Sequence, residues 1–231
     1  MKNDARSFNR NARVPPANCR GLLLVFFLLL IAACTPAKSP GRAFEYYTLE
    51  YASPVFGNRP PFDELLTVER FSAAQAFNTT AMVYRSAPVV LNTYTYHRWK
   101  SSPPEMVTDL MLRDLRHSGL FKAVFPEYDE ADARFVLQGR LVEFMEIEDE
   151  GNRKALLSLD ITLLDRSRVS SAGGVIFQKG YRALEPLESL TPAAYARAMS
   201  RAMEQVSRQT TSDICEAVEK TGKSKDGRPA P

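Results

Sequence analysis

The feature that most constrains the fold is a pair of neighbouring segments in which apolar residues take every second position. In residues 155–163 every odd position is apolar, and the even positions carry Ser158, Asp160 and Thr162. The odd positions of residues 135–147 carry Phe135, Leu137, Gly139, Leu141, Met145 and Ile147. A period of two is typical of strands that bury one face, as antiparallel sheets allow. The acidic stretch Glu148–Asn152 between them predicts a solvated turn, so the pair predicts a long hairpin.

Shorter strands are predicted on both sides of this hairpin. A turn at Ser86–Pro88 lies between two apolar runs and predicts a second hairpin. The strands expected outside the central pair are residues 45–51, 65–71, 81–85, 89–94, 120–125 and 175–183.

Two amphipathic helices are predicted, and each begins with a hydroxyl residue followed by proline. Ser102-Pro103-Pro104-Glu105 has the pattern of a capping box, and Gly119 is placed to end that helix. Thr191-Pro192 begins the second helix, whose apolar stripe runs to about Glu219. The expected fold is α+β, with a largely antiparallel (mixed) β-sheet packed against two amphipathic helices.

The first 33 residues have the pattern of an export signal. Basic residues precede the uncharged run 21–33, which is shorter than the roughly 20 residues of a membrane-spanning helix. The following Ile31-Ala32-Ala33-Cys34 resembles the bacterial lipoprotein box, in which cleavage occurs between Ala33 and Cys34 and lipid is attached to the cysteine sulfur. An ordinary signal peptide with an incidental cysteine is the alternative.

Several acyl chains on one cysteine anchor a protein stably to a membrane. Aspartate after the cysteine retains such lipoproteins in the inner membrane, so Thr35 predicts the outer membrane, on its periplasmic face. The expected organisation is a signal peptide (1–33), a lipidated flexible tether (34–43), a single α+β domain (44–219) and a disordered tail (220–231).

Charge and cysteine content exclude several classes of protein. The formal net charge of +3 comes from the signal, because residues 34–231 hold 25 basic and 26 acidic residues. This balance gives no support for nucleic-acid binding. Cys215 is the one cysteine that remains after Cys19 and Cys34, so no internal disulfide is expected. Its helical surroundings predict a buried apolar role.

The sequence contains no recognisable catalytic, cofactor or metal motif. It has two histidines without zinc-ligand spacing, no G-x-S-x-G and no glycine-rich phosphate loop. We therefore expect no enzyme activity, cofactor or metal. Aromatic residues cluster in the first half, and Tyr96, Arg98 and Trp99 are a candidate partner surface because such residues are enriched in interface hot spots. Burial in the core is the alternative for each.

The order of several short motifs over most of residues 44–214 resembles the ABC-type transport auxiliary lipoproteins, the paraquat-inducible protein C-like group. The motifs are Tyr46-Tyr47-Thr48-Leu49, Met82-Val83-Tyr84-Arg85, Arg98-Trp99 followed by Pro103-Pro104, His117–Val124 and Leu137-Gln138-Gly139-Arg140-Leu141. The resemblance implies an outer-membrane lipoprotein that works with an ABC transporter and a lipid-binding MCE protein. Such systems move lipids or hydrophobic compounds across the Gram-negative envelope, and the family has no catalytic residues to transfer.

Three functions therefore stay open at this point. The first is an accessory subunit of an MCE-type transport assembly, with self-association undecided. The second is a periplasmic lipid-binding carrier that holds an acyl chain between sheet and helices. The third is a secreted hydrolase without a recognisable motif, which would need a pocket beside His97.

Overall fold

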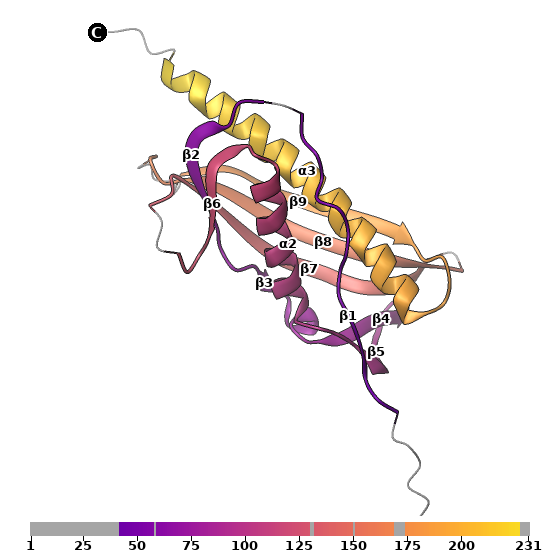
Figure 1. The fold of residues 1–231 in the computed structure, drawn as a ribbon. Coiled ribbons are helices and arrows are strands. Elements are labelled where there is room, and N and C mark those ends of the chain that lie inside the picture. Colours follow the sequence, from indigo (N-terminus) through magenta and orange to yellow (C-terminus); the bar gives the residue numbers. More distant parts are fainter. Residues whose placement is uncertain (1–41, 58, 130–131, 150, 169–173, 227–231) are drawn as a thin grey trace, which may run out of the picture. The chain divides into compact units, whose positions relative to one another are not determined.

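The computed structural model describes residues 42–57, 59–129, 132–149, 151–168 and 174–226 (Figure 1). A compact unit that begins at Ala43 contains, within these ranges, two α-helices and a mixed sheet of nine strands. The predicted α+β class is confirmed. The predicted signal peptide, the predicted cleavage site, Cys34 and most of the predicted tether lie outside the described residues.

The elements follow the predicted order, with different bounds. The helices are α2 (Pro103–His117) and α3 (Pro192–Asp226), and a short 3₁₀ helix spans Gln75–Phe77. The strands are β1 (Glu45–Tyr47), β2 (Phe62–Val68), β3 (Ser72–Ala73), β4 (Ala81–Ala87), β5 (Val90–Trp99), β6 (Phe121–Pro126), β7 (Phe135–Asp149), β8 (Asn152–Asp165) and β9 (Val175–Pro186).

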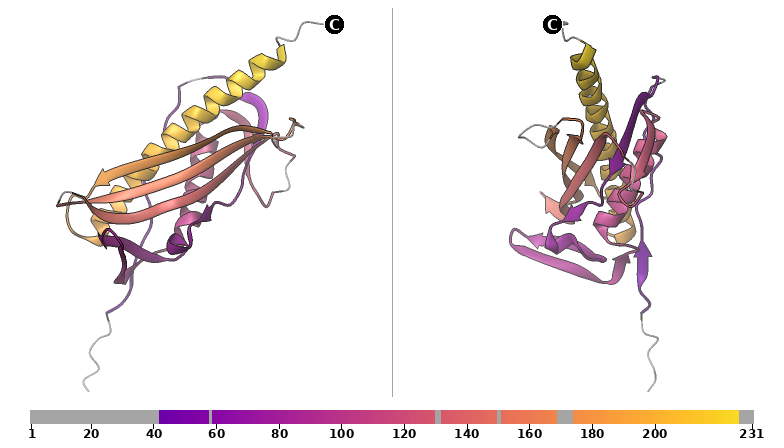
Figure 2. Two further views of the ribbon diagram at one scale, coloured as in Figure 1. Left: turned by 180° about the vertical axis from the view of Figure 1, so that it is seen from behind. Right: turned by 90° about the vertical axis from the view of Figure 1, so that its left-hand side faces the viewer.

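Strand β7 is the centre of the sheet. Along one edge it pairs in parallel with β2, β3 and β4 in turn, and along the other it pairs antiparallel with β8. The remaining antiparallel pairs are β4–β5 and β8–β9, whereas β1–β5 and β2–β6 are parallel. Both helices lie on the same face of the β7–β9 part of the sheet (Figures 1 and 2).

The alternation predicted for residues 135–147 holds only as far as Leu141. The pairing of β7 with β8 shifts between Leu141 and Glu143, which inserts one extra residue and reverses the faces beyond it. Phe144 then pairs with Leu157, on the side that faces the helices, and Met145 pairs with Leu156 on the other side. The predicted single apolar face through Ile147 is therefore wrong after this bulge.

The core fills the layer between the sheet and the helices. The apolar odd positions of residues 155–163 are all fully buried there, as the alternation predicted. Gly139 lies on this face of β7, where a Cβ atom would come within 2.4 Å of the Phe71 ring. The ring therefore occupies the space that any larger residue at position 139 would need.

The helix starts follow the predicted caps. The Glu105 carboxylate accepts a hydrogen bond from the Ser102 backbone N–H at 3.2 Å, and the Thr191 hydroxyl accepts one from Ala194 N–H at 3.2 Å. Gly119 has a φ of 63°, as a residue that ends a helix requires. Helix α3 continues past Glu219 to Asp226, so the prediction of a tail from residue 220 is wrong; residues 227–231 lie outside the described residues.

The predicted strand 45–51 ends at Tyr47, because the following segment crosses the helices instead (Figure 1). Asp114 of α2 is fully buried and accepts hydrogen bonds from the hydroxyls of Tyr51 and Ser207, each at 2.6 Å. The Glu50 N–H also donates to Ser200 Oγ on α3 at 3.0 Å. These bonds tie the segment to both helices.

A buried ion cluster at one end of β7 and β8 predicts a pH-dependent stability. The Asp165 carboxylate is fully buried and accepts hydrogen bonds from Arg134 Nε at 2.9 Å and Nη2 at 2.8 Å, and from Ser167 Oγ at 2.7 Å. Arg134 also pairs with Glu64. Burial alone would raise the pKa of Asp165, but the bonds from Arg134 and Ser167 lower the pKa to about 2.

We expect Asp165→Asn to lower the free energy of unfolding near neutral pH by roughly 2–3 kcal/mol. A carboxylate with a lowered pKa stabilises the fold above its unfolded pKa of about 3.9, and this contribution is lost as the pH falls towards 2. The difference between the variant and the unaltered protein should therefore vanish at low pH in urea unfolding curves. Asp63→Asn is the control, because the exposed Asp63–Lys122 pair should contribute little. Equal effects of the two substitutions would contradict the assignment.

Candidate functional site

The predicted partner residues Tyr96, Arg98 and Trp99 lie at the end of β5, beside the edge strand β1. The structure does not place them on one surface. Trp99 is 0% exposed, and its ring packs edge-on against Phe144 at 5.2 Å and Tyr195 of α3 at 5.4 Å between ring centroids. The prediction that Trp99 contributes to a partner surface is wrong, because its side chain faces the helices.

An exposed group of aromatic and basic residues lies on the opposite side of the β1–β5 pair. We define the aromatic–basic patch as Phe44, Tyr46, Tyr96, Arg98 and Lys100. The parallel pairing sets Tyr46 opposite Arg98. Phe44 is 47% exposed, Tyr46 57% and Tyr96 38%. The patch therefore retains Tyr96 and Arg98 of the predicted surface and adds Phe44 and Tyr46 from β1 and its flank and Lys100, which follows β5.

Contacts within the patch place each cation over a ring. The Arg98 guanidinium carbon lies 4.8 Å from the centroid of the Phe44 ring, and Lys100 Nζ lies 5.4 Å from that of Tyr46. The Phe44 and Tyr96 ring centroids are 6.3 Å apart. Cation–π attraction at exposed sites contributes about 0.5–1 kcal/mol, enough to bias the side chains towards this arrangement. The patch thus offers aromatic area together with positive charge.

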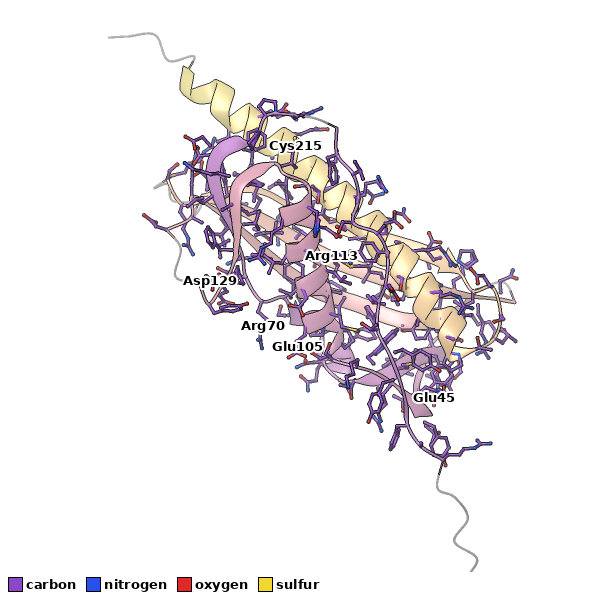
Figure 3. All side chains as sticks on the ribbon, viewed as in Figure 1. Glu45, Arg70, Glu105, Arg113, Asp129 and Cys215 are labelled. Carbon is purple, nitrogen blue, oxygen red and sulfur yellow. The ribbon has the colours of Figure 1, made fainter. Side chains whose placement is uncertain are left out.

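The other side of the same strand pair carries a hydrogen-bonded cluster. Tyr47 OH donates to the Glu45 carboxylate at 2.6 Å and lies 3.2 Å from His97 Nδ1. Burial and the neighbouring Glu45 raise the pKa of Tyr47 to about 12, so this hydroxyl stays protonated. Figure 3 labels Glu45 at this edge of the sheet. His97 lines none of the grooves described below, so the pocket that a hydrolase would need beside it is not among them.

Two open grooves lie elsewhere on the surface. One, of about 510 Å³, lies at the start of α2, where Arg70 and Glu105 are 3.9 Å apart (Figure 3). The other, of about 450 Å³, lies between β9 and the C-terminal half of α3 and is lined by Lys179, Asp213 and Lys220 among others. Charged and apolar side chains share the lining of both grooves, and both are open to solvent, so neither encloses an acyl chain.

The interior also gives no support to the carrier hypothesis. The layer between the sheet and the helices is occupied by fully buried side chains, the largest of which include Trp99, Tyr195, Phe135 and Phe144. Cys215 is 7% exposed and has a free thiol, which confirms its predicted burial. Burial raises the pKa of this thiol, and the neighbouring Glu219 adds to the effect.

Within the described ranges, no three histidine, cysteine or acidic side chains converge in a way that could hold a metal ion. The helices of that part of the chain are likewise too short or too polar to cross a membrane. The contacts of the buried charged residues Asp114, Glu146 and Asp165 are with tyrosine or serine hydroxyls and arginines of the fold itself. Among the described residues, the aromatic–basic patch is an exposed group that combines aromatic rings with cations.

A family model and several solved structures match this chain. A model of the family described as ABC-type transport auxiliary lipoprotein component matches residues 47–210, from the end of β1 into α3. No curated protein matches the chain. The crystal structure of protein XCC0632 from Xanthomonas campestris, of family DUF330, shares the fold with a TM-score of 0.70 and 20% identity, over 78% of this chain and 99% of that one. The crystal structure of an uncharacterized protein aligns with a TM-score of 0.58 and 13% identity, over 74% and 99% of the two chains.

Proposed function

Since the chain belongs to the family of ABC-type transport auxiliary lipoprotein components, we propose that it is a lipid-anchored accessory subunit of an ABC transport system with an MCE-domain partner. In this role it assists the movement of lipids or hydrophobic compounds across a Gram-negative envelope. The observation that carries the proposal is the family match, which covers nearly the whole folded unit.

The proposed anchor is lipid on Cys34, placed by Thr35 in the outer membrane with the folded unit in the periplasm. The lipoprotein-box pattern Ile31-Ala32-Ala33-Cys34 supports this assignment. Residues 34–231 are close to neutral, which is compatible with attachment through lipid instead of through a strongly basic surface.

The proposed mode of action is protein contact without catalysis. Several buried polar groups fix segments of the fold, as Asp114 does between Tyr51 and Ser207. The two grooves described above are open and have mixed charged and apolar linings, which suits polypeptide contact better than enclosure of a small apolar substrate.

The proposal is tested by purifying full-length tagged protein from gently solubilised membranes and identifying co-purified proteins by mass spectrometry. We expect an MCE-domain protein together with ABC permease and ATPase subunits, all absent from a parallel purification of untagged protein. Recovery of the lipidated protein as an isolated monomer under the same extraction would overturn the proposal.

A further inference from the structure

We propose that the aromatic–basic patch rests on the headgroup region of the membrane that carries the lipid anchor, and thereby orients the folded unit. The proposal rests on the proposed anchoring through Cys34. It adds a second, non-covalent contact at a defined site. Phe44 and Tyr46 come from β1 and its flank, and Tyr96, Arg98 and Lys100 come from β5 and the residue after it.

Chain length is the first argument. Nine residues, 35–43, separate Cys34 from Phe44. Fully extended, the ten Cα–Cα steps from Cys34 to Phe44 span at most about 36 Å. A lipid on Cys34 therefore keeps the patch within this distance of the bilayer surface. Such tethering raises the effective concentration of the patch at the membrane surface, so a weak affinity for headgroups is enough to keep the patch bound.

The chemistry of the patch is the second argument. Tyrosine rings concentrate at membrane interfaces, where one part of the side chain is apolar and the other is hydrated. Arg98 and Lys100 are positively charged and are attracted to anionic phospholipid headgroups. Each basic residue near such a surface contributes about 1 kcal/mol to the free energy of binding. Their stems can lie along the rings while the charged ends reach the headgroups.

The arrangement of charge is the third argument. Alternation along β1 turns Glu45 to the side opposite Tyr46, where its carboxylate accepts a hydrogen bond from the Tyr47 hydroxyl. Glu45 therefore does not interrupt the positive side of the strand pair. Lipid phosphates would meet the two cations and the ring edges on that side.

Photo-crosslinking tests the contact directly. Full-length lipidated protein is reconstituted in phosphatidylethanolamine vesicles containing phosphatidylglycerol, with Tyr46 replaced by benzoylphenylalanine. Tyr128 carries the same replacement in the control, because it is 79% exposed and follows β6, at the other end of the strand order from β1. We expect phospholipid adducts at position 46 in at least fivefold excess over position 128, and equal yields would overturn the proposal.

A second measurement separates this contact from the anchor. A variant without residues 1–34 keeps the whole compact unit that begins at Ala43 but lacks the basic and apolar signal and the acceptor thiol, so it should associate weakly with phosphatidylglycerol-containing vesicles. Lys100→Ala in that background should weaken the association about fivefold. Lys220→Ala is the matched control, because this lysine is 79% exposed at the far end of α3 and should have little effect. Equal losses from the two substitutions would count against the patch.

The outcomes distinguish the two proposals. Lipid mass on Cys34 with equal crosslinking at positions 46 and 128 overturns the membrane contact and leaves the anchored subunit intact. In native membranes, adducts of position 46 with a protein in place of phospholipid also overturn it and assign the patch to a protein partner. Absence of lipid on Cys34 together with failed co-purification contradicts the proposed function itself.

Discussion

Replacing Cys34 with serine is expected to abolish incorporation of labelled palmitate and to remove the protein from the outer-membrane fraction. Lipid is joined to such proteins through a thioether, which a serine hydroxyl cannot form. Each buried methylene contributes about 0.8 kcal/mol to membrane binding, so the loss of several acyl chains removes far more affinity than any surface contact supplies. The change is measured by metabolic labelling and by fractionation of full-length protein.

The other two cysteines are the matched controls for this experiment. Cys215 is buried on α3, with its sulfur 3.7 Å from a Glu219 carboxylate oxygen, so Cys215→Ser should keep full labelling. Cys19→Ser, within the proposed signal, should do the same. Labelling that persists in Cys34→Ser, or disappears in Cys215→Ser, would show that the lipid is attached elsewhere.

The parts of the fold that could be predicted from the sequence depend on local interactions. The start of α2 is determined within four residues, Ser102–Glu105, and its end by Gly119 with a φ of 63°. The hairpin of β7 and β8 follows from alternation on both sides of a short turn. Such signals need no knowledge of distant parts of the chain.

The missed features depend on pairing between distant segments. Strand β1 pairs with the end of β5 in parallel, and β7 receives three parallel partners along one edge. The bulge between Leu141 and Glu143 reverses the faces of β7 without any glycine or proline at that point to signal it. As a result, the burial of Glu146 could not be predicted from the sequence; its carboxylate accepts a hydrogen bond from the Tyr94 hydroxyl at 2.7 Å.

The candidate site could be predicted in part from the sequence, because alternation along a strand separates neighbouring side chains. Arg98 and Trp99 are adjacent in a strand, so their side chains must point to opposite sides. Side chains two residues apart in a strand lie on the same side, so Arg98 shares a surface with Tyr96 and Trp99 does not. The contributions of Phe44 and Tyr46 could not be inferred, because they depend on the pairing of β1 with β5.

Trp99→Ala is expected to cause the largest loss of stability. The indole is fully buried between β7 and α3, and truncating a buried tryptophan to alanine costs about 3–5 kcal/mol. Since domains are stable by roughly 5–15 kcal/mol, this loss is a large fraction of the total. Trp99 is the sole tryptophan, so unfolding is followed by circular dichroism in urea instead of by tryptophan fluorescence.

Two further variants make the reason for that loss testable. Tyr96→Ala, three residues away on the exposed side, should change the free energy of unfolding by less than about 1 kcal/mol. Among the described residues the indole N–H of Trp99 has no hydrogen-bond partner, so Trp99→Phe removes an unsatisfied donor and should cost less than Trp99→Ala. If Tyr96→Ala destabilised the protein as strongly as Trp99→Ala, the division of this strand into a buried and an exposed side would be refuted. The division places Tyr96→Ala above both Trp99 variants, and the ring that Trp99→Phe keeps in the core places it above Trp99→Ala.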